Sequence, residues 1–435
     1  MRRVLHAGLI LLIITFFAIP PLGAAPRNPR GQGPPSRGPY VSDEVLVQFK
    51  ADIRPDVAAA AVGARVHGRI EGLGIYILKV PEGTVEATIR ALSNNPLVEF
   101  AEPNFYAQAF VIPNDPYDNP ASCPYQSSDG SFTCQWYWSR VKAYDAWGVT
   151  MGSDTVKVAV VDTGIDVGGV SQFGVPDGKH PDLAVCNRTV DLKSYVGGES
   201  GNDDNVHGTH VAGVIGACTN TPTATGIAGA NWNNRLMAVK VLDYSGSGTY
   251  SAVASGIRYA ADNGAQVINL SLGGSSPSRT LKRAVDYAWS KNTVLVCAAG
   301  NSGTSAPSYP ARYDNCLAVA ATDQNDAKAS FSTYGTWVEV AAPGVKIFSL
   351  MQDTWEWCFL CYWYGYYAGY DSLSGTSMAT AVVSGLAALI WSVPGLCSTN
   401  SCVRSRIENF ADQIPGTGSY WTKGRVNYFN SVNAP

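Results

Sequence analysis

Residues 374–391 read SGTSMATAVVSGLAALIW, a short stretch of small side chains followed by an almost entirely apolar run. The run from Val382 to Trp391 predicts a helix, and a helix that is apolar on all sides is buried in a core. Ser377 then lies at the N-terminus of this helix, where free N–H groups and the helix dipole favour developing negative charge. The stretch therefore predicts a buried helix with a reactive serine at its start.

Strands and helices alternate upstream of this helix. Short apolar runs typical of buried strands occur at residues 157–161, 236–241, 266–270, 293–298 and 316–321. Helical spacing occurs between them, at residues 251–263 and 280–290. Buried strands with intervening helices predict an α/β fold with a mainly parallel central sheet that is covered on both faces. In such folds the working residues lie beyond the carboxyl ends of the strands.

Four polar residues occupy positions that suit nucleophilic catalysis. Asp162 directly follows the first apolar strand, His207 opens a helix of small residues, and Asn301 lies just past a later strand. A serine hydroxyl such as that of Ser377 needs an adjacent base, and a histidine suits this task near neutral pH. A carboxylate then orients the histidine, while an amide and a backbone N–H stabilise the oxyanion. The sequence predicts these four catalytic residues.

Each of these residue types also has an ordinary structural use. An aspartate after a strand is often a turn residue, a serine before a helix is often a cap, and Asn301 could merely shape a turn. His207 and His210 are three residues apart and could form a metal pair, although no third ligand at zinc-like spacing is evident. The four segments together favour catalysis over these alternatives.

Composition excludes several classes of protein. The chain has 435 residues, 15% of them charged, and a net charge of 31 − 34 = −3, which gives no reason to expect nucleic acid as a partner. The 44 glycines and 25 prolines follow no period, so collagen, coiled-coil and solenoid folds are excluded. All ten cysteines fall at or after Cys123, which indicates that the last three-quarters of the chain is a separate unit built for an oxidising compartment.

The N-terminus has the three regions of a secretory signal. Arg2 and Arg3 precede an apolar run from Leu9 to Ile19, and small residues follow. We expect a signal peptide at residues 1–25, with an uncleaved signal anchor as the alternative, and a Pro/Gly-rich linker at residues 26–40. No second apolar run of about 18 residues occurs, so we expect no membrane attachment once the signal is removed.

Residues 41–109 have the pattern of a small α+β domain. Strands are expected at residues 45–49, 75–80 and 98–101, and helices at residues 55–62 and 84–92. This segment contains no cysteine and no cluster of catalytic residue types. Its position between a signal and the cysteine-bearing unit favours a propeptide.

The segments around Asp162, His207, Asn301 and Ser377 resemble the signatures of the subtilisin-like serine protease family, peptidase S8. Residues 113–117, 322–326 and 330–335 are similar to its thermitase branch. The resemblance implies a three-layer subtilisin-like catalytic domain at residues 110–435. It also implies that residues 41–109 form a ferredoxin-like propeptide of the inhibitor type, which acts as intramolecular chaperone and inhibitor. The order Asp, His, Ser along the chain is that of subtilisin.

The resemblance further implies a secreted, self-processed serine endopeptidase that acts as a monomer on proteins and peptides. Family enzymes bind peptide as an added strand between two segments, and this backbone-directed mode tolerates many sequences. The segments that match here, and the wall of the pocket before the scissile bond, are Gly246, Ser247, Gly248, Ser271, Leu272, Gly273, Ala298, Ala299 and Gly300. None of these residues is acidic, so we expect an apolar preference.

The resemblance also implies structural calcium. Asp115 and Asp182 match two carboxylate ligands of a calcium site in the family, and the loop at residues 218–227 would add carbonyl groups and the side chain of Asn220. Calcium takes several hard oxygen ligands, which such loops supply. The alternative is that the two carboxylates are simply solvated.

The cysteines are expected to pair locally. The expected pairs are Cys123–Cys134, Cys186–Cys218, Cys358–Cys361 and Cys397–Cys402. Cys297 and Cys316 lie on neighbouring predicted strands and either pair or stay buried and reduced. A redox role for Cys358 and Cys361 is the alternative to a structural bridge, but the βαβ context of a redox motif is missing.

Three features depart from the family pattern. Ala381 and Val382 stand where a Pro-His pair commonly follows the serine motif, which changes the packing beneath the nucleophile. Val206 replaces a glycine that often precedes the catalytic histidine, and we expect it to stiffen the loop. Residues 351–370 form an insertion with far more Phe, Trp and Tyr than the 11% of the whole chain. We interpret it as a lip for substrate residues after the scissile bond, with a self-packed aromatic flap as the alternative. A catalytically silent protein that binds peptides through this insertion is the second functional hypothesis.

Overall fold

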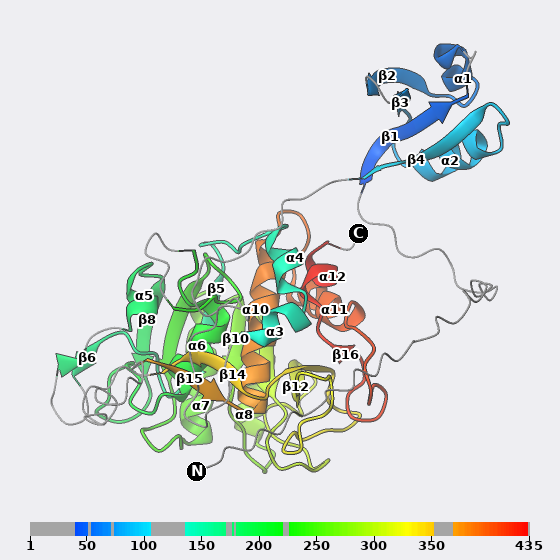
Figure 1. The fold of residues 1–435 in the computed structure, drawn as a ribbon. Helices are drawn as coiled ribbons and strands as arrows, with labels where there is room; N and C mark the ends of the chain where they lie inside the picture. The colour runs from blue at the N-terminus through cyan, green and yellow to red at the C-terminus, as the bar shows by residue number, and fades with distance from the viewer. Residues whose placement is uncertain are drawn as a thin grey trace, which may run out of the picture. The chain divides into compact units, whose positions relative to one another are not determined.

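The computed structural model describes residues 40–50, 54–70, 74–105, 135–170, 176–177, 180–220, 226–351 and 369–433. The chain divides into two compact units, residues 1–106 and 107–435, and each is described by itself (Figure 1). The predicted signal peptide, most of the predicted linker and the predicted domain boundary after residue 109 lie outside the described residues.

The first unit is a four-stranded antiparallel sheet with two helices. The strand order is β2-β3-β1-β4, the arrangement of a ferredoxin-like fold, so the predicted α+β class is confirmed. Its elements are β1 (Tyr40–Phe49), α1 (Pro55–Ala60), β2 (Arg65–Ile70), β3 (Ile75–Lys79), α2 (Val85–Ser93) and β4 (Val98–Phe105). The sequence did not predict β2, because its side chains are mostly polar and alternate between half-buried and exposed.

An eight-stranded sheet with parallel pairing throughout forms the centre of the second unit. The strand order is β16-β13-β12-β11-β10-β5-β9-β8. The bounds are β5 (Lys157–Asp162), β8 (Thr189–Ser194), β9 (Arg235–Lys240), β10 (Val267–Leu270), β11 (Val294–Ala298), β12 (Cys316–Thr322), β13 (Val340–Pro343) and β16 (Gly424–Arg425). All five predicted strands are confirmed, with ends that differ by one residue at most.

Helices cover both faces of this sheet and create two cores. One core joins the sheet to α6 and α10, and the other joins it to α7 and α8 (Figure 1). The helices are α3 (Trp136–Arg140), α4 (Ala143–Trp147), α5 (Pro181–Ala184), α6 (His207–Gly216), α7 (Tyr250–Asp262), α8 (Arg279–Ser290), α10 (Thr376–Ser392), α11 (Asn400–Asn409) and α12 (Tyr428–Asn433). Two hairpins complete the unit, made by β6 (Gly169–Val170) with β7 (Pro176–Asp177) and by β14 (Ile347–Leu350) with β15 (Tyr370–Leu373).

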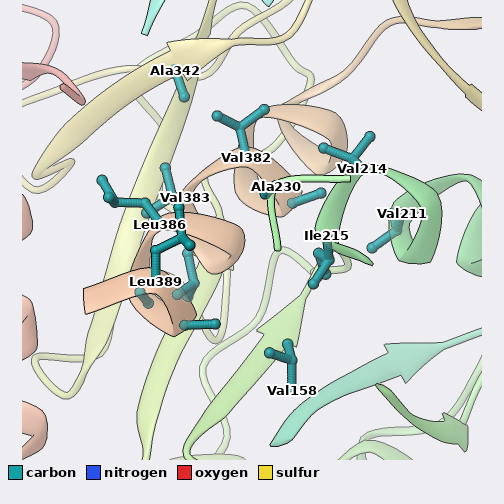
Figure 2. Close-up of a cluster of buried hydrophobic side chains, with 14 of the residues drawn as sticks. Val158, Val211, Val214, Ile215, Ala230, Ala342, Val382, Val383, Leu386 and Leu389 are labelled. Carbon is teal, nitrogen blue, oxygen red and sulfur yellow. The ribbon is translucent and has the colours of Figure 1, made fainter. Parts of the chain in front are cut away.

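Helix α10 is the buried helix that the apolar run predicted. Every residue from Thr376 to Ile390 is buried. Its side chains Val382 and Leu386 lie among those of α6 and the sheet, such as Val214 of α6 and Ala342 of β13 (Figure 2). Burial of this whole apolar surface fixes the position of the first turn of the helix, which carries Ser377. None of the described helices is long and apolar enough to cross a membrane.

Three disulfides brace the described part of the second unit. Cys186–Cys218 and Cys397–Cys402 form as expected. Cys297 of β11 and Cys316 of β12 also form a bridge, which decides between the two alternatives that the sequence left open. The other two expected pairs, Cys123–Cys134 and Cys358–Cys361, lie outside the described residues.

The close packing of α10 predicts the effect of one added methyl group. A Cβ atom built on Gly385 would lie 2.2 Å from the Cβ of Ala230, so Gly385→Ala overpacks the core. We expect it to lower the free energy of unfolding by about 1–3 kcal/mol. Urea unfolding would be measured in Ser377→Ala protein to prevent self-digestion. Gly197→Ala is the control, because nothing lies within 4 Å of its added Cβ. Equal stability of the two variants would contradict the packing argument.

Candidate active site

Asp162 and His207 form a short hydrogen bond at the carboxyl edge of the sheet. Asp162 ends β5, between the strands β9 and β10, and its side chain is fully buried. Its Oδ1 atom lies 2.7 Å from Nδ1 of His207 and also accepts the N–H of Thr163 at 2.7 Å. The carboxylate therefore holds the imidazole with Nδ1 protonated and Nε2 available as a base.

Burial and neighbouring carboxylates have opposite effects on the pKa of His207. Burial lowers the pKa of His207, but the negative charge and hydrogen bond of Asp162 and the charge of Asp203 raise it, and the net direction is upward. In contrast, burial and the nearby His207 lower the pKa of His210 to about 3, so His210 is neutral. No cluster of three potential metal-ligating side chains occurs among the described residues, and the metal pair finds no third ligand there.

Ser377 is the second residue of α10 and makes a reciprocal contact with Ser271. Its hydroxyl donates to the carbonyl oxygen of Ser271 at 3.0 Å, and the Ser271 hydroxyl donates to the carbonyl oxygen of Ser377 at 2.8 Å. The Ser377 hydroxyl is thus bonded to Ser271 and not to His207. Catalytic hydrogen bonds often form only when substrate is present, and rotation of one side-chain bond redirects this hydroxyl.

Asn301 lies in the loop after β11 and is oriented by the start of α10. Its Oδ1 atom accepts the backbone N–H and the hydroxyl of Thr376, both at 2.9 Å. The amide nitrogen therefore faces away from Thr376. A Cβ atom built on Gly375 would lie 3.4 Å from Asn301 Nδ2 and 3.6 Å from the backbone nitrogen of Ser377. The two nitrogen donors therefore lie near one point, an arrangement that can stabilise an oxyanion.

A cleft of about 460 Å³ opens beside His207. Two predicted substrate-binding segments, Gly246–Gly248 and Ser271–Gly273, line it together with Leu242 and Tyr250. No acidic side chain lines this described cleft. Ala298 and Ala299 are buried and Gly300 is half-buried, and none of these three lines the cleft, so the structure does not join them to the other two segments.

Two family comparisons now agree with this geometry. Residues 153–429 match the subtilase family, and residues 26–104 match the fervidolysin N-terminal prodomain family. The chain belongs to the subtilase family. It is a serine endopeptidase with an N-terminal prodomain, and its three-layer fold is the one that the sequence predicted.

Relatives of this subtilase include a thermophilic serine proteinase and thermitase. A thermophilic serine proteinase of Bacillus sp. strain AK1 is 43% identical over 403 residues, covering 91% of this chain and 88% of the relative. Thermitase of Thermoactinomyces vulgaris is 47% identical over 310 residues, covering 71% of this chain and 99% of thermitase. The solved structure of a protease from Pseudoalteromonas arctica PAMC 21717 aligns with a TM-score of 0.60 and 28% identity, over 74% of this chain and 99% of that one. These matches support the predicted thermitase branch.

The sequence did not predict the contacts that several polar residues make around the catalytic candidates of this subtilase. Thr163 bonds to the start of α6, Ser271 holds the Ser377 hydroxyl, and Thr376 orients Asn301. Asp203 bonds to the turn before His207. Thr163 and Thr376 are adjacent in sequence to catalytic candidates, Ser271 was predicted only as a substrate-binding residue, and Asp203 lies four residues before His207. None of these positions reveals where a side chain points.

The structure describes part of the predicted calcium site. The side chain of Asp182 is fully buried, and its Oδ2 accepts the N–H of Ile227 at 2.9 Å. The N–H of Cys218 bonds to the Asp182 carbonyl at 2.9 Å, so the loop that carries Asn220 begins beside Asp182. The disulfide Cys186–Cys218 fixes the same junction. Asp115 lies outside the described residues, as do residues 221–225.

The electrostatics predict a measurable change at His207. Because Asp162 raises the pKa of His207 by charge and hydrogen bonding, Asp162→Asn should lower that pKa. Histidine titration by NMR in the Ser377→Ala protein measures this directly. His180 is the internal control, since burial lowers its pKa to about 4 independently of Asp162. A His207 pKa that stays the same or rises in Asp162→Asn would show that the carboxylate does not control this imidazole.

Proposed function

We propose that this subtilase hydrolyses peptide bonds through Asp162, His207 and Ser377, with Asn301 and the Ser377 N–H as oxyanion donors. The observation that carries the proposal is the 2.7 Å hydrogen bond between Asp162 and His207 at the edge of the cleft. The pairing of Asn301 Nδ2 with the Ser377 nitrogen around one space supports it. Together these groups supply a base, an orienting carboxylate and two oxyanion donors.

In the proposed reaction the Ser377 hydroxyl leaves the Ser271 carbonyl and transfers its proton to Nε2 of His207. Ser377 Oγ attacks the carbonyl carbon of the scissile bond, and the resulting oxyanion accepts hydrogen bonds from Asn301 Nδ2 and the Ser377 N–H. His207 then donates the proton to the leaving amine nitrogen, which breaks the C–N bond and leaves an acyl-enzyme. Water then attacks the ester carbonyl while His207 Nε2 takes its proton. His207 returns the proton to Ser377 Oγ, which breaks the ester bond and releases the carboxylic acid product.

The proposed substrate is an extended peptide that adds a strand between Gly246–Gly248 and Ser271–Gly273. Recognition by backbone hydrogen bonds tolerates many side chains, so broad specificity follows. The absence of acidic side chains from the described cleft lining supports an apolar-leaning preference over one for Lys or Arg. Residues 352–368 of the proposed lip, which spans residues 351–370, lie outside the described residues, and the role of the lip stays a prediction.

A serine-directed phosphonylating probe separates hydrolysis from the alternative of a silent peptide-binding protein. The probe reacts only with an activated serine, so it should label the mature wild-type protein at Ser377 and leave Ser377→Ala unlabelled. Under the alternative, both proteins bind peptides and neither is labelled.

We further propose that the protein is secreted as a zymogen and that its prodomain, described over residues 40–105, acts as an intramolecular chaperone and inhibitor. Residues 105–109 are uncharged and precede the catalytic unit, so they suit a product-like fit in the cleft. We expect self-cleavage within about two residues of Ala109. The Ser377→Ala protein should accumulate as a precursor of roughly residues 25–435. Maturation of purified Ser377→Ala protein without any added protease would disprove self-cleavage.

Calcium fits the described part of its proposed site. A buried carboxylate at Asp182 and an amide oxygen at Asn220 are hard ligands from two joined segments, and Asp115 would add a second carboxylate. The bound ion would stabilise the fold and take no part in the proton transfers.

Removal of calcium should lower the melting temperature, because an ion that binds only the folded state stabilises it by mass action. Asp182→Ala should lower the melting temperature similarly, and chelator should have no further effect on that variant. Asp154→Ala, at an exposed aspartate, is the control and should respond to chelator as wild type does. A wild-type melting curve that stays unchanged after long incubation with excess chelator would contradict the calcium proposal.

A further inference from the structure

Val206, the residue immediately before His207, has a strained backbone. Its φ is +92° and its ψ is −24°, in the left-handed region that a β-branched side chain rarely adopts. Such strain costs free energy and persists only where surrounding contacts impose it. The carbonyl oxygen of Val206 accepts the N–H of His210 at 3.0 Å, so this strained residue begins helix α6. The direction in which His207 leaves the backbone therefore depends on what holds Val206.

The buried carboxylate of Asp203 holds this turn from both sides. Its Oδ1 atom accepts the N–H groups of Asn205 at 3.0 Å and of Val206 at 3.2 Å. Its Oδ2 atom accepts the N–H and the hydroxyl of Thr209, at 2.8 and 2.6 Å. One side chain thus binds the backbone on either side of His207, and it is only 1% exposed.

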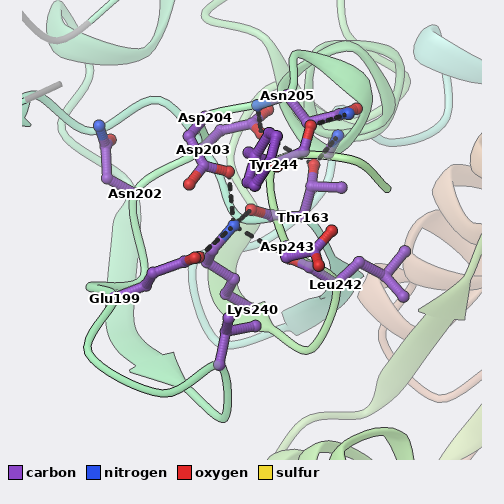
Figure 3. A network of polar contacts seen from close by, with 12 residues as sticks. Thr163, Glu199, Asn202, Asp203, Asp204, Asn205, Lys240, Leu242, Asp243 and Tyr244 are labelled. Carbon is purple, nitrogen blue, oxygen red and sulfur yellow. Dashed lines mark hydrogen bonds and ion pairs between the residues drawn. The ribbon is translucent and has the colours of Figure 1, made fainter. Parts of the chain in front are cut away.

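Asp203 also binds the segment that carries Asp162. The hydroxyl of Thr163 donates to Asp203 Oδ1 at 2.8 Å and accepts the N–H of Gly208 at 2.9 Å (Figure 3). The carbonyl oxygen of Thr163 accepts a hydrogen bond from Lys240 Nζ at 2.7 Å, and the fully buried Lys240 pairs with Asp204 at 2.7 Å. Thr163, the neighbour of Asp162, is fixed through its side chain and its backbone.

We propose that Asp203 is a positioning residue of the catalytic triad: its carboxylate holds Val206 in the strained turn, ties that turn to Thr163, and so keeps His207 within hydrogen-bonding distance of Asp162. This inference rests on the proposed roles of Asp162 and His207. An ordinary helix cap would use only the bonds to Thr209. The additional bonds to Val206 and Thr163 join the two chain segments that must stay in register for catalysis.

Substitution of Asp203 by asparagine tests the proposal with little change in shape. The asparagine amide has one acceptor oxygen, so either the N–H groups of Asn205 and Val206 or the donors of Thr209 lose their partner. Strain at Val206 then pulls the turn away from its active geometry. Glycine adopts a positive φ without this cost, so Val206→Gly removes the strain that Asp203 opposes.

The test is a double-mutant cycle of Asp203→Asn with Val206→Gly, made in the full-length chain. kcat and KM are measured on a short chromogenic peptide, with active sites counted by the phosphonylating probe. We expect Asp203→Asn to lower kcat by about tenfold or more with KM changed less than about twofold, because a misplaced base weakens transition-state stabilisation. In the Val206→Gly background the same substitution should lower kcat by no more than about threefold.

Asp323→Asn is the matched control. Asp323 also accepts N–H groups two and four residues ahead, from Asn325 at 2.8 Å and Ala327 at 3.0 Å. Its turn contains another residue with positive φ, Asp326, and makes no described bond to Thr163 or His207. Its kcat should match that of wild type.

Several outcomes would overturn the proposal. Asp203→Asn could lower kcat equally in the wild-type and Val206→Gly backgrounds, which is the result expected of a simple helix cap. It could also change only KM, or it could leave kcat unchanged. If Asp203→Asn yields no titratable sites, Val206→Gly must restore them, and failure to do so also overturns the proposal. An inactive wild-type protein would overturn the proposed function and this inference together, whereas an additive cycle in an active protein overturns the inference alone.

Discussion

Helix α10 is buried along almost its whole length between the parallel sheet and helix α6. This packing fixes the position of Ser377 in the first turn of the helix. The sheet contributes the other half of the constraint, because parallel strands bring all their carboxyl ends to one edge. Asp162, Ser271 and Asn301 therefore lie at the same edge, at or just after the ends of β5, β10 and β11. Ser271 and Asn301 bond there to the first turn of α10, and Asp162 bonds to His207. The packing of α10 on the parallel sheet thus forms the apolar core and also positions the residues of the candidate site.

Within that frame, the site is organised by polar contacts that point inward from short connections. Thr376 turns the Asn301 amide so that its nitrogen shares a space with the Ser377 N–H, and Asp162 selects the protonation of His207. These contacts hold Asn301 and His207 in place without substrate, so under the proposed function little reorganisation would be needed as charge develops in the transition state. The resting Ser377 hydroxyl, bonded to Ser271, is the part of this arrangement that must move.

The sequence predicts the central sheet and helix α10 well. Burial on both faces of the sheet gives strands such as residues 157–161 a continuous apolar run. The prediction fails where the physical signal is weak or non-local. In strand β2, exposed polar side chains alternate with the half-buried residues Val66, Gly68 and Ile70, and none of the six residues is fully buried. The pairing of β2 with β3 therefore has only a weak signal in the local sequence. The four catalytic candidates were found through motifs, whereas the roles of Asp203 and Ser271 depend on side-chain direction. The sequence predicted only that Val206 stiffens its loop, and it gave no sign that the φ angle of Val206 is positive.

We propose that the sheet edge and the start of α10 hold one base, one nucleophile and two oxyanion donors around a single substrate carbonyl. The most direct measurement is an experimental structure of the mature protein after reaction with a peptidyl phosphonate. We expect a bond from Ser377 Oγ to phosphorus, with the phosphonyl oxygen within hydrogen-bonding distance of Asn301 Nδ2 and the Ser377 nitrogen. We also expect the peptide to lie between Gly246–Gly248 and Ser271–Gly273. A phosphonyl oxygen turned away from Asn301, or attachment at any other residue, would contradict it.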